Sequence, residues 1–227
     1  MRAECLVRWL RWLLTIPVLG ICGCLYSGSA DVIATLEESI VDPRPPSGWP
    51  GDTPGITEAG RFYFAGQPGE AGLRHAASMQ VSIVVDLRTE PEVAEGPFDE
   101  EALVTRLGMK YVSIPVTPSS FCLKDVERFG QLVKQRRSGC DDPSPECLIL
   151  IHDDTSDRAG AMWAALLHGW TYRNLDSSIK SGMDAGLQSE EMIEALRRVS
   201  PALMSRQRGR ADWPVVWIGQ DSNHSFP

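Results

Sequence analysis

Residues 148–167 read LILIHDDTSDRAGAMWAALL, which divides into an apolar run, a polar loop and a run of small and apolar residues. The run 148–151 has the length and branched apolar content of a strand that is buried on both faces, as in a parallel sheet. The run 159–167 is rich in alanine and leucine and contains no proline, which favours a helix. A loop between a strand and a helix N-terminus directs free backbone N–H groups and the positive end of the helix dipole at one point. The sequence therefore predicts an anion-binding loop over residues 152–158.

The rest of the chain predicts a similar alternation of strands and helices. Strands are expected at 62–65, 81–87 and 110–115, and helices at 70–78, 99–107, 123–137 and 189–199. Asp99 is the candidate cap of the helix 99–107. Residues 88–98 are acidic and broken by prolines, and they are expected to form a loop. This alternation predicts an α/β fold with three α/β/α layers and a central, mostly parallel sheet of four to five strands. Ligands of such sheets bind at the carboxyl ends of the strands.

The loop after the strand 148–151 resembles the phosphate-binding loop of cysteine-dependent tyrosine and dual-specificity phosphatases, especially their bacterial tyrosine-phosphatase-like domains. In that family the loop runs His-Cys, four residues, Arg, and here it runs His152-Asp153, four residues, Arg158. Upstream motifs follow the order of the family, namely RFYFAGQP at 61–68, VSIVVDLR at 81–88 and GMKYVSIP at 108–115. The resemblance covers about residues 61–169 and implies a phosphatase fold.

The resemblance also implies which residues form the site. Asp153 and Arg158 take the catalytic positions, with aspartate where the family has cysteine. The residues expected to contact a substrate are His152, Asp154, Thr155, Ser156, Asp157, Ala159 and Gly160. Neither a cofactor nor a metal ion is expected in a site of this kind.

Aspartate at position 153 removes the thiolate that attacks phosphorus in the family. A carboxylate is a much weaker nucleophile in that geometry, and it repels the substrate. At an effective dielectric constant of about 20, unit charges about 4 Å apart interact by roughly 4 kcal/mol, so a phosphate dianion facing Asp153 loses on the order of 8 kcal/mol. Arg158 offsets part of this repulsion or pairs with Asp153 directly. We therefore expect that binding of phosphorylated or other anionic ligands is weakened.

A general acid is also missing from the expected place. In the family a nearby loop carries an aspartate that protonates the leaving oxygen, whereas residues 116–121 contain no carboxylate. Asp125 follows in the first turn of the helix expected at 123–137, where the helix dipole alone favours an acidic residue. The sequence thus predicts a catalytically impaired phosphatase-like domain, a pseudophosphatase, that acts as an exported binding or interaction module.

Other functions remain open at this stage. An active phosphatase that hydrolyses phosphate monoesters with a rearranged site is the main alternative, and a purely structural envelope protein is another. Aspartyl-phosphate enzymes place a second carboxylate two residues after their aspartate, but that position holds Thr155, while Asp154 is adjacent. The three aspartates of the loop lack a clear fourth ligand for a metal ion.

Composition and charge exclude other classes. The chain has 227 residues and 43% hydrophobic content, enough for the core of a single domain. Its net charge of -8 argues against a nucleic-acid partner, which requires a basic face.

The N-terminus predicts export. Arg2, Arg8 and Arg11 precede an uncharged stretch over 12–30, so residues 1–30 are expected to be a signal peptide or membrane anchor. Cleavage after Ala30, acylation of Cys24 and retention of an uncleaved anchor are all compatible with this pattern. We expect a periplasmic or cell-envelope location, with a membrane tether in the latter two cases.

Domain boundaries follow from composition. Residues 31–59 are expected to be a proline- and glycine-rich linker from which Trp49 and Ile56 pack on the domain, residues 60–205 the phosphatase-like domain, and residues 206–227 a C-terminal tail. Within this tail, the apolar residues of 213–218 are expected to add an edge strand or a docking patch.

Cysteine usage is compatible with export. A bridge between Cys140 and Cys147 would close about eight residues and contribute roughly 2.5 kcal/mol in the chain-entropy model. An oxidising compartment would allow it. Cys122 is then unpaired and is expected to be a small buried hydrophobe rather than a displaced nucleophile.

Overall fold

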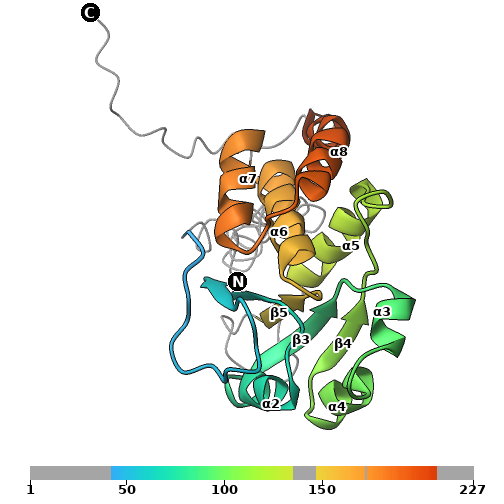
Figure 1. Cartoon of the computed structure of the whole chain (residues 1–227). Helices are drawn as coiled ribbons and strands as arrows, with labels where there is room; N and C mark the ends of the chain where they lie inside the picture. Colours follow the sequence, from blue (N-terminus) through green and yellow to red (C-terminus); the bar gives the residue numbers. More distant parts are fainter. Residues whose placement is uncertain (1–41, 135–146, 172, 209–227) are drawn as a thin grey trace, which may run out of the picture.

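The computed structural model describes residues 42–134, 147–171 and 173–208 (Figure 1). The expected signal segment with Cys24, the Cys140 half of the expected disulfide, and the apolar run 213–218 lie outside these residues. Within the described part of the chain, no helix has the length and hydropathy needed to cross a bilayer.

A five-stranded sheet forms the centre of the domain, in the order β1-β2-β5-β3-β4 (Figure 1). The strands are β1 Thr57–Ala59, β2 Phe62–Ala65, β3 Val81–Asp86, β4 Lys110–Ser113 and β5 Leu148–His152. β1 pairs antiparallel with β2, and the other neighbours pair in parallel. The mostly parallel sheet predicted from the sequence is confirmed.

The sheet begins earlier than the sequence predicted. β1 lies within residues 31–59, which were expected to be a linker. The strand starts only after the last proline of that stretch, Pro54. Arg44 pairs with Glu58 through backbone hydrogen bonds of 3.1 and 2.8 Å, so β1 is covered on its outer side. Trp49 packs on Tyr63 and His75, with ring centroids 5.2 and 5.0 Å apart.

Helices cover both faces of the sheet (Figure 1). They are α2 Glu70–Ser78, α3 Glu90–Ala94, α4 Glu100–Arg106, α5 Leu123–Val133, α6 Asp157–Trp170, α7 Leu175–Asp184 and α8 Glu190–Arg208. α5 to α8 lie on one face and α2 and α4 on the other, which confirms the three-layer architecture. Asp99 caps α4 as predicted, since its side chain accepts a hydrogen bond from the Ala102 amide at 2.9 Å.

The prediction that residues 88–98 form only a loop is wrong, because they contain α3. Thr89 and Glu92 form a capping box at its N-terminus. Pro91 is tolerated because it lies in the first turn, where its missing N–H breaks no helical hydrogen bond.

Helix α6 is the centre of the larger core, and all its residues from Ala159 to Trp170 are buried. Its Trp163 ring lies against Phe62 and Phe64 of β2, with centroid distances of 5.1 and 5.3 Å. These two phenylalanines face α6 because alternate residues of a strand share one face. The fold therefore fixes the start of α6 firmly over the end of β5.

Candidate functional site

The loop over residues 153–156 joins β5 to α6 at the carboxyl ends of the parallel strands. Its flanks are held by β2 and the segment after it. Gly66 forms a bridge with Thr155, and the amide of Gln67 donates to the Asp154 carbonyl at 3.3 Å. The predicted strand, loop and helix thus occur in the expected place.

The Asp153 carboxylate lies inside the loop rather than facing solvent, and its residue is fully buried. One oxygen, Oδ1, accepts hydrogen bonds from the amides of Thr155, at 2.8 Å, and Ser156. The other, Oδ2, accepts from the Arg158 amide and from its Nε at 3.3 Å. The carboxylate therefore occupies the N–H groups that an anion bound in this loop would need. The expected pairing of Asp153 with Arg158 is present.

The Arg158 guanidinium is held from its other side by Glu92 of α3. Nη1 donates to Oε2 at 2.9 Å and Nη2 to Oε1 at 2.7 Å, so the contact is bidentate. Nη1 also donates to the Val116 carbonyl at 3.3 Å. This charge-assisted geometry is the one in which arginine usually binds an external phosphate or carboxylate. Here the carboxylate belongs to the chain itself.

Both members of this pair stay charged near neutral pH. The Arg158 hydrogen bond is the main cause that lowers the pKa of Glu92 to about 2. Burial acts to lower the pKa of Arg158, but the hydrogen bond with Glu92 and the charge of Asp153 raise it on balance. The Arg158 guanidinium thus lies between the carboxyl groups of Glu92 and Asp153.

Glu92 was not among the residues predicted for the site. A sequence signal was available, because Thr89 and Glu92 have the spacing of a capping box directly after the Asp-Leu-Arg end of β3. That signal predicts a helix start, but it does not reveal that the carboxylate reaches Arg158 across the loop.

The structure gives several predicted substrate contacts a packing role instead. Ser156 has a left-handed backbone, with φ of 76°, and its side chain lies against Gly55 and Gly186, so it points away from the loop centre. Ala159 and Gly160 are buried within α6. A Cβ at Gly160 would lie 2.5 Å from the Gly182 carbonyl of α7. The backbones of α6 and α7 are therefore in direct contact at this point.

Asp157 holds the start of α8. Its Oδ1 accepts hydrogen bonds from the amides of Gln188 and Ser189 at 2.6 and 2.8 Å, and its Oδ2 accepts one from the Ser189 hydroxyl at 2.5 Å. Asp154 and Thr155 are exposed at the rim of the loop. Of the predicted site residues, Asp153 and Arg158 are therefore the two whose side chains meet at the centre of the loop, together with the loop amides.

His152 faces the interior. It is fully buried, and its Nε2 lies 2.8 Å from Glu100 Oε1. Burial acts to lower the pKa of His152, but the charge of Glu100 outweighs it and raises the pKa. The histidine therefore belongs to a network beneath the loop.

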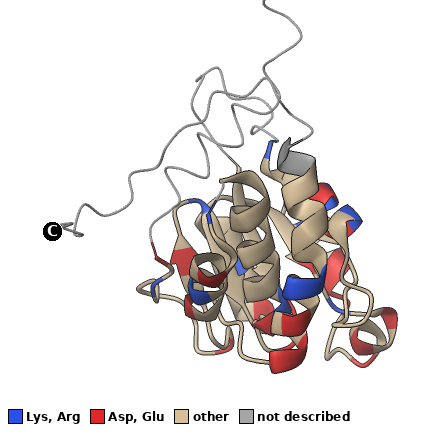
Figure 2. Ribbon diagram, turned by 90° about the horizontal axis from the view of Figure 1, so that it is seen from above, with Lys and Arg blue, Asp and Glu red and all other residues tan. Residues whose placement is uncertain are grey.

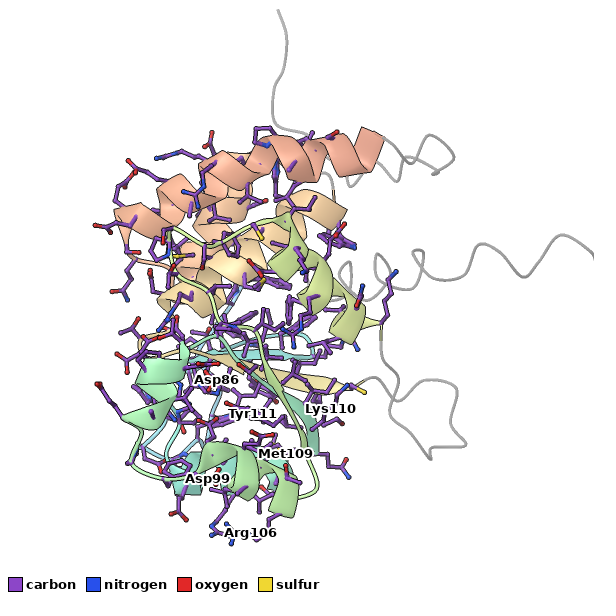
Figure 3. All side chains as sticks on the ribbon, turned by 90° about the vertical axis from the view of Figure 1, so that its right-hand side faces the viewer. Asp86, Asp99, Arg106, Met109, Lys110 and Tyr111 are labelled. Carbon is purple, nitrogen blue, oxygen red and sulfur yellow. The ribbon has the colours of Figure 1, made fainter. Side chains whose placement is uncertain are left out.

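Arg88 is the cation at the centre of that network. Its Nη2 lies 2.6 Å from Asp86 and 2.7 Å from Glu100. The Tyr111 hydroxyl donates to Asp86 at 2.7 Å, from the neighbouring strand β4 (Figure 3). Burial acts to raise the pKa of Asp86, but the hydrogen bonds from Arg88 outweigh it and lower the pKa. Asp86 and Arg88 therefore form a structural ion pair at the end of β3.

Asp86, Glu100 and His152 also have the spacing of a metal-ligand group. The guanidinium of Arg88 is already paired with both carboxylates, and it lies between them. A metal ion would have to displace a buried arginine from two ion pairs, so this donor set does not fit one.

A cleft of about 340 Å³ opens beside the loop. Its lining consists of Thr89, Glu92, Thr117, Pro118, Thr155, Asp157, Arg158 and Met192. Arg158 is the cation among these residues. The two carboxylates among them, Glu92 and Asp157, already accept hydrogen bonds within the chain. Along the ribbon of the described residues, Figure 2 shows short basic segments interspersed with acidic ones.

The loop that precedes α5 offers hydroxyl groups where a general acid would be needed. Thr117 Oγ1 lies 3.0 Å from the hydroxyls of Ser119 and Ser120. Asp125 is a capping residue, as its Oδ2 accepts hydrogen bonds from the amide and thiol of Cys122 at 3.0 and 3.3 Å. Cys122 is exposed, so the prediction that it is buried is wrong. Cys122 is the N-cap of α5, and an N-cap residue normally lies at the surface.

Neither a protein-family model nor a curated protein matches this chain. Several solved structures, in contrast, are similar to this chain. A Shewanella putrefaciens protein described as a DUF442 phosphatase shares 22% identity over 66% of this chain and 94% of its own, with a TM-score of 0.52. TpbA of P. aeruginosa, in complex with phosphotyrosine, shares 13% identity over 77% and 99%, with a TM-score of 0.55. The kinase-associated phosphatase KAP shares 16% identity over 63% and 88%, with a TM-score of 0.51.

These identities are low, so the likeness concerns the fold. The similarity in fold agrees with the mostly parallel sheet of this chain, with the helices on both faces of that sheet, and with the loop between β5 and α6. The chain has the fold of the cysteine-dependent tyrosine and dual-specificity phosphatases.

Proposed function

We propose that this protein is a pseudophosphatase, a phosphatase-fold domain that no longer hydrolyses phosphate esters and acts as a binding or interaction module. The observation that carries the proposal is the position of the Asp153 carboxylate. It accepts four hydrogen bonds from the loop and Arg158, so it fills the place of the substrate's phosphate. A carboxylate held in this way presents no free lone pair to an incoming phosphorus atom.

Electrostatics supports the same conclusion. A phosphate dianion in the loop would face Asp153, and the guanidinium that could compensate is already paired with Glu92. Preorganised donors accelerate phosphoryl transfer only if they are available to the charge that develops on the phosphoryl oxygens. The cleft also lacks a carboxylate that is free to protonate a leaving group, since Glu92 and Asp157 are both engaged.

The location of the protein is part of the proposal. The arginines and the uncharged stretch within residues 1–30 support export to the periplasm or cell envelope, with a tether at Cys24 or through the segment itself. TpbA holds phosphotyrosine on the same fold, which supports a residual ability of this site to meet an anionic ligand with weakened affinity.

The test compares the full-length wild type with Asp153→Cys on p-nitrophenyl phosphate, each with EDTA and with magnesium. We expect no turnover by the wild type and measurable turnover by Asp153→Cys, because the thiolate restores a nucleophile and frees the loop amides. Arg158→Lys in the Asp153→Cys background should abolish that turnover, since lysine cannot bind two phosphate oxygens side by side. Metal-independent hydrolysis by the wild type would overturn the proposal in favour of an active phosphatase with a rearranged site.

A further inference from the structure

The outer edge of β4 borders a groove that lies apart from the loop at Asp153. β4 is the last strand of the sheet, and among the strands of the described residues it has a neighbour, β3, on one side only. A groove of about 450 Å³ follows the other side. Its lining consists of Lys110–Ser113 of β4, Glu101 of α4, and Arg128, Gln131 and Leu132 of α5. Figure 3 looks onto this side of the molecule.

The groove presents backbone groups that can pair with another strand. Successive N–H groups of a strand point to opposite edges, and in a parallel pair the N–H and C=O of one residue point to the same edge. The Ile114 amide donates to the Asp86 carbonyl of β3 at 2.8 Å, so the backbone groups of Tyr111 and Ser113 point away from β3. An extended segment binds such an edge through main-chain hydrogen bonds, and its side chains contact both faces of the sheet.

Both faces of the sheet continue into the groove. Val112 packs against the larger core, which includes α5, and Tyr111 packs against the smaller core, which includes α4. Both side chains stay partly exposed, whereas Val84 and Val85 of the neighbouring β3 are fully buried. A strand beside β4 would cover Val112 on one face and Tyr111 on the other. Such a strand needs apolar side chains on both of its faces.

The C-terminal part of the chain contains a segment with this pattern. Residues 213–218 read WPVVWI, an apolar run without charge that has the length of a strand. Proline has no N–H and is confined to edge strands, where its nitrogen faces outward. When the amides of Val215 and Trp217 face β4, Pro214 faces the outer side, where no donor is needed. The segment therefore suits the last position in a sheet.

The charges of the groove complement those of the segment. Lys110 and Arg128 line the groove together with one acidic residue, Glu101. Asp212 and Asp221 flank the apolar run. Opposite charges of this kind at the two ends of a docked strand favour its binding and oppose the binding of a basic segment.

The connection to α8 also favours this segment. Residues 209–212 join it to α8, and an extended chain of this length spans about 14 Å. Near the end of α8, the side chain of Leu203 lies 2.9 Å from the position of a Cβ at Gly169. The next residue, Trp170, lies 2.8 Å from the position of a Cβ at Gly130 of α5. The end of α8 is thus close to α5, the helix that borders the groove.

We infer that residues 213–218 pair with β4 as a further strand of the same sheet and close the groove. The segment lies outside the described residues. The open edge of β4, the apolar pattern of the segment and its short link to α8 support the pairing. The groove is separate from the cleft at Asp153 and Arg158, so the pairing holds whether or not the loop binds phosphate.

The test measures amide hydrogen exchange of the full-length protein by NMR. We expect the amides of Tyr111 and Ser113 to exchange slowly in the wild type, because their acceptors lie in the segment. The double substitution Val216→Lys with Trp217→Lys places a charge on each face of the segment, and a charge is costly to bury. Exchange of both amides should then accelerate at least about tenfold.

Ser222→Lys with Asn223→Lys is the matched control, because it adds the same charge to the tail outside the apolar run. It should change these exchange rates less than about twofold. The Val112 amide points towards β3, so its slow exchange in every variant shows that the domain stays folded. Fast exchange of Tyr111 and Ser113 in the wild type, or protection that survives the first double substitution, refutes the pairing. Protection that rises with protein concentration also refutes it, and assigns the edge of β4 to a second copy of the chain.

Discussion

At the scale of single residues, the aspartate at position 153 fills the loop as well as removing the thiol. Its Oδ1 accepts the amides two and three residues further on, which is the local hydrogen-bond pattern that aspartate favours in turns. The sequence alone predicted repulsion between this carboxylate and a phosphate. It did not predict that the loop amides would be consumed, because that depends on the orientation of the backbone around Ser156.

The ion pair between Glu92 and Arg158 predicts a pH dependence. The pKa of Glu92 is lowered from 4.5 to about 2, so the stability that this pair contributes is fully present above pH 4.5 and is lost as the pH falls towards 2. The Glu92 side chain is 37% exposed, so solvent screening keeps this contribution small. A titration of the Glu92 carboxyl carbon by NMR should give a midpoint well below 4.5. A midpoint at the ordinary value would show that the pair does not persist in solution.

At the scale of elements, the site depends on how closely α6 meets its neighbours. A Cβ at Gly160 would collide with the Leu187 amide and the Gly182 carbonyl, which are backbone atoms that cannot turn away. Asp157, at the start of the same helix, holds the beginning of α8. The N-terminus of α6 is therefore fixed by contacts that have no part in binding an anion.

Substitution of Gly160 by alanine should test this packing. We expect Gly160→Ala to lower the free energy of unfolding by about 2 kcal/mol, because the steric cost outweighs the gain in helix propensity. Gly51→Ala is the control, since a Cβ at Gly51 would meet nothing within 4 Å. Denaturant unfolding of both variants measures the difference. Equal stability of the two variants would mean that α6 and α7 can separate without cost.

At the scale of the whole molecule, the network of Asp86, Arg88, Glu100 and His152 connects β3, α4 and β5 beneath the loop. All four residues are at most 4% exposed. Glu100 is the shared partner, because it contacts both Arg88 and His152. Removing one member of a buried ionic network leaves uncompensated charge, which is why such networks are sensitive to single substitutions.

We expect Glu100→Ala to destabilise the protein by about 3–5 kcal/mol. Glu101→Ala should cost less than about 0.5 kcal/mol, since Glu101 is the exposed neighbour in the same turn of α4. Chemical denaturation of the two variants provides the measurement. A small effect of Glu100→Ala would show that Arg88 and His152 find other partners or water.

Periodic apolar patterns and cap residues predicted much of the fold. Helix α2 has the predicted bounds, and Asp99 caps α4 as expected. Helix α3 was missed because its attachment depends on a contact with Arg158, which lies far away in the sequence. Strand β1 was missed because it is short and forms only against β2.

For the site, the motif located Asp153 and Arg158, but it could not separate residues whose backbone contributes to the loop from those whose side chains do. Ser156 shows the difference, since its amide contacts Asp153 while its side chain lies against Gly55 and Gly186. The left-handed backbone that causes this has no signature in a serine.

The loop over residues 153–156, whose amides are bound by its own Asp153, has a consequence for how this protein can evolve. Because Asp153 supplies the acceptor that keeps the loop amides in place, the loop keeps its shape in a cell that offers no phosphorylated ligand. Natural selection for folding then acts on the buried residues, whereas it does not constrain the exposed rim formed by Asp154 and Thr155. A survey of natural variants should find the rim variable and the pair of Asp153 and Arg158 inherited together.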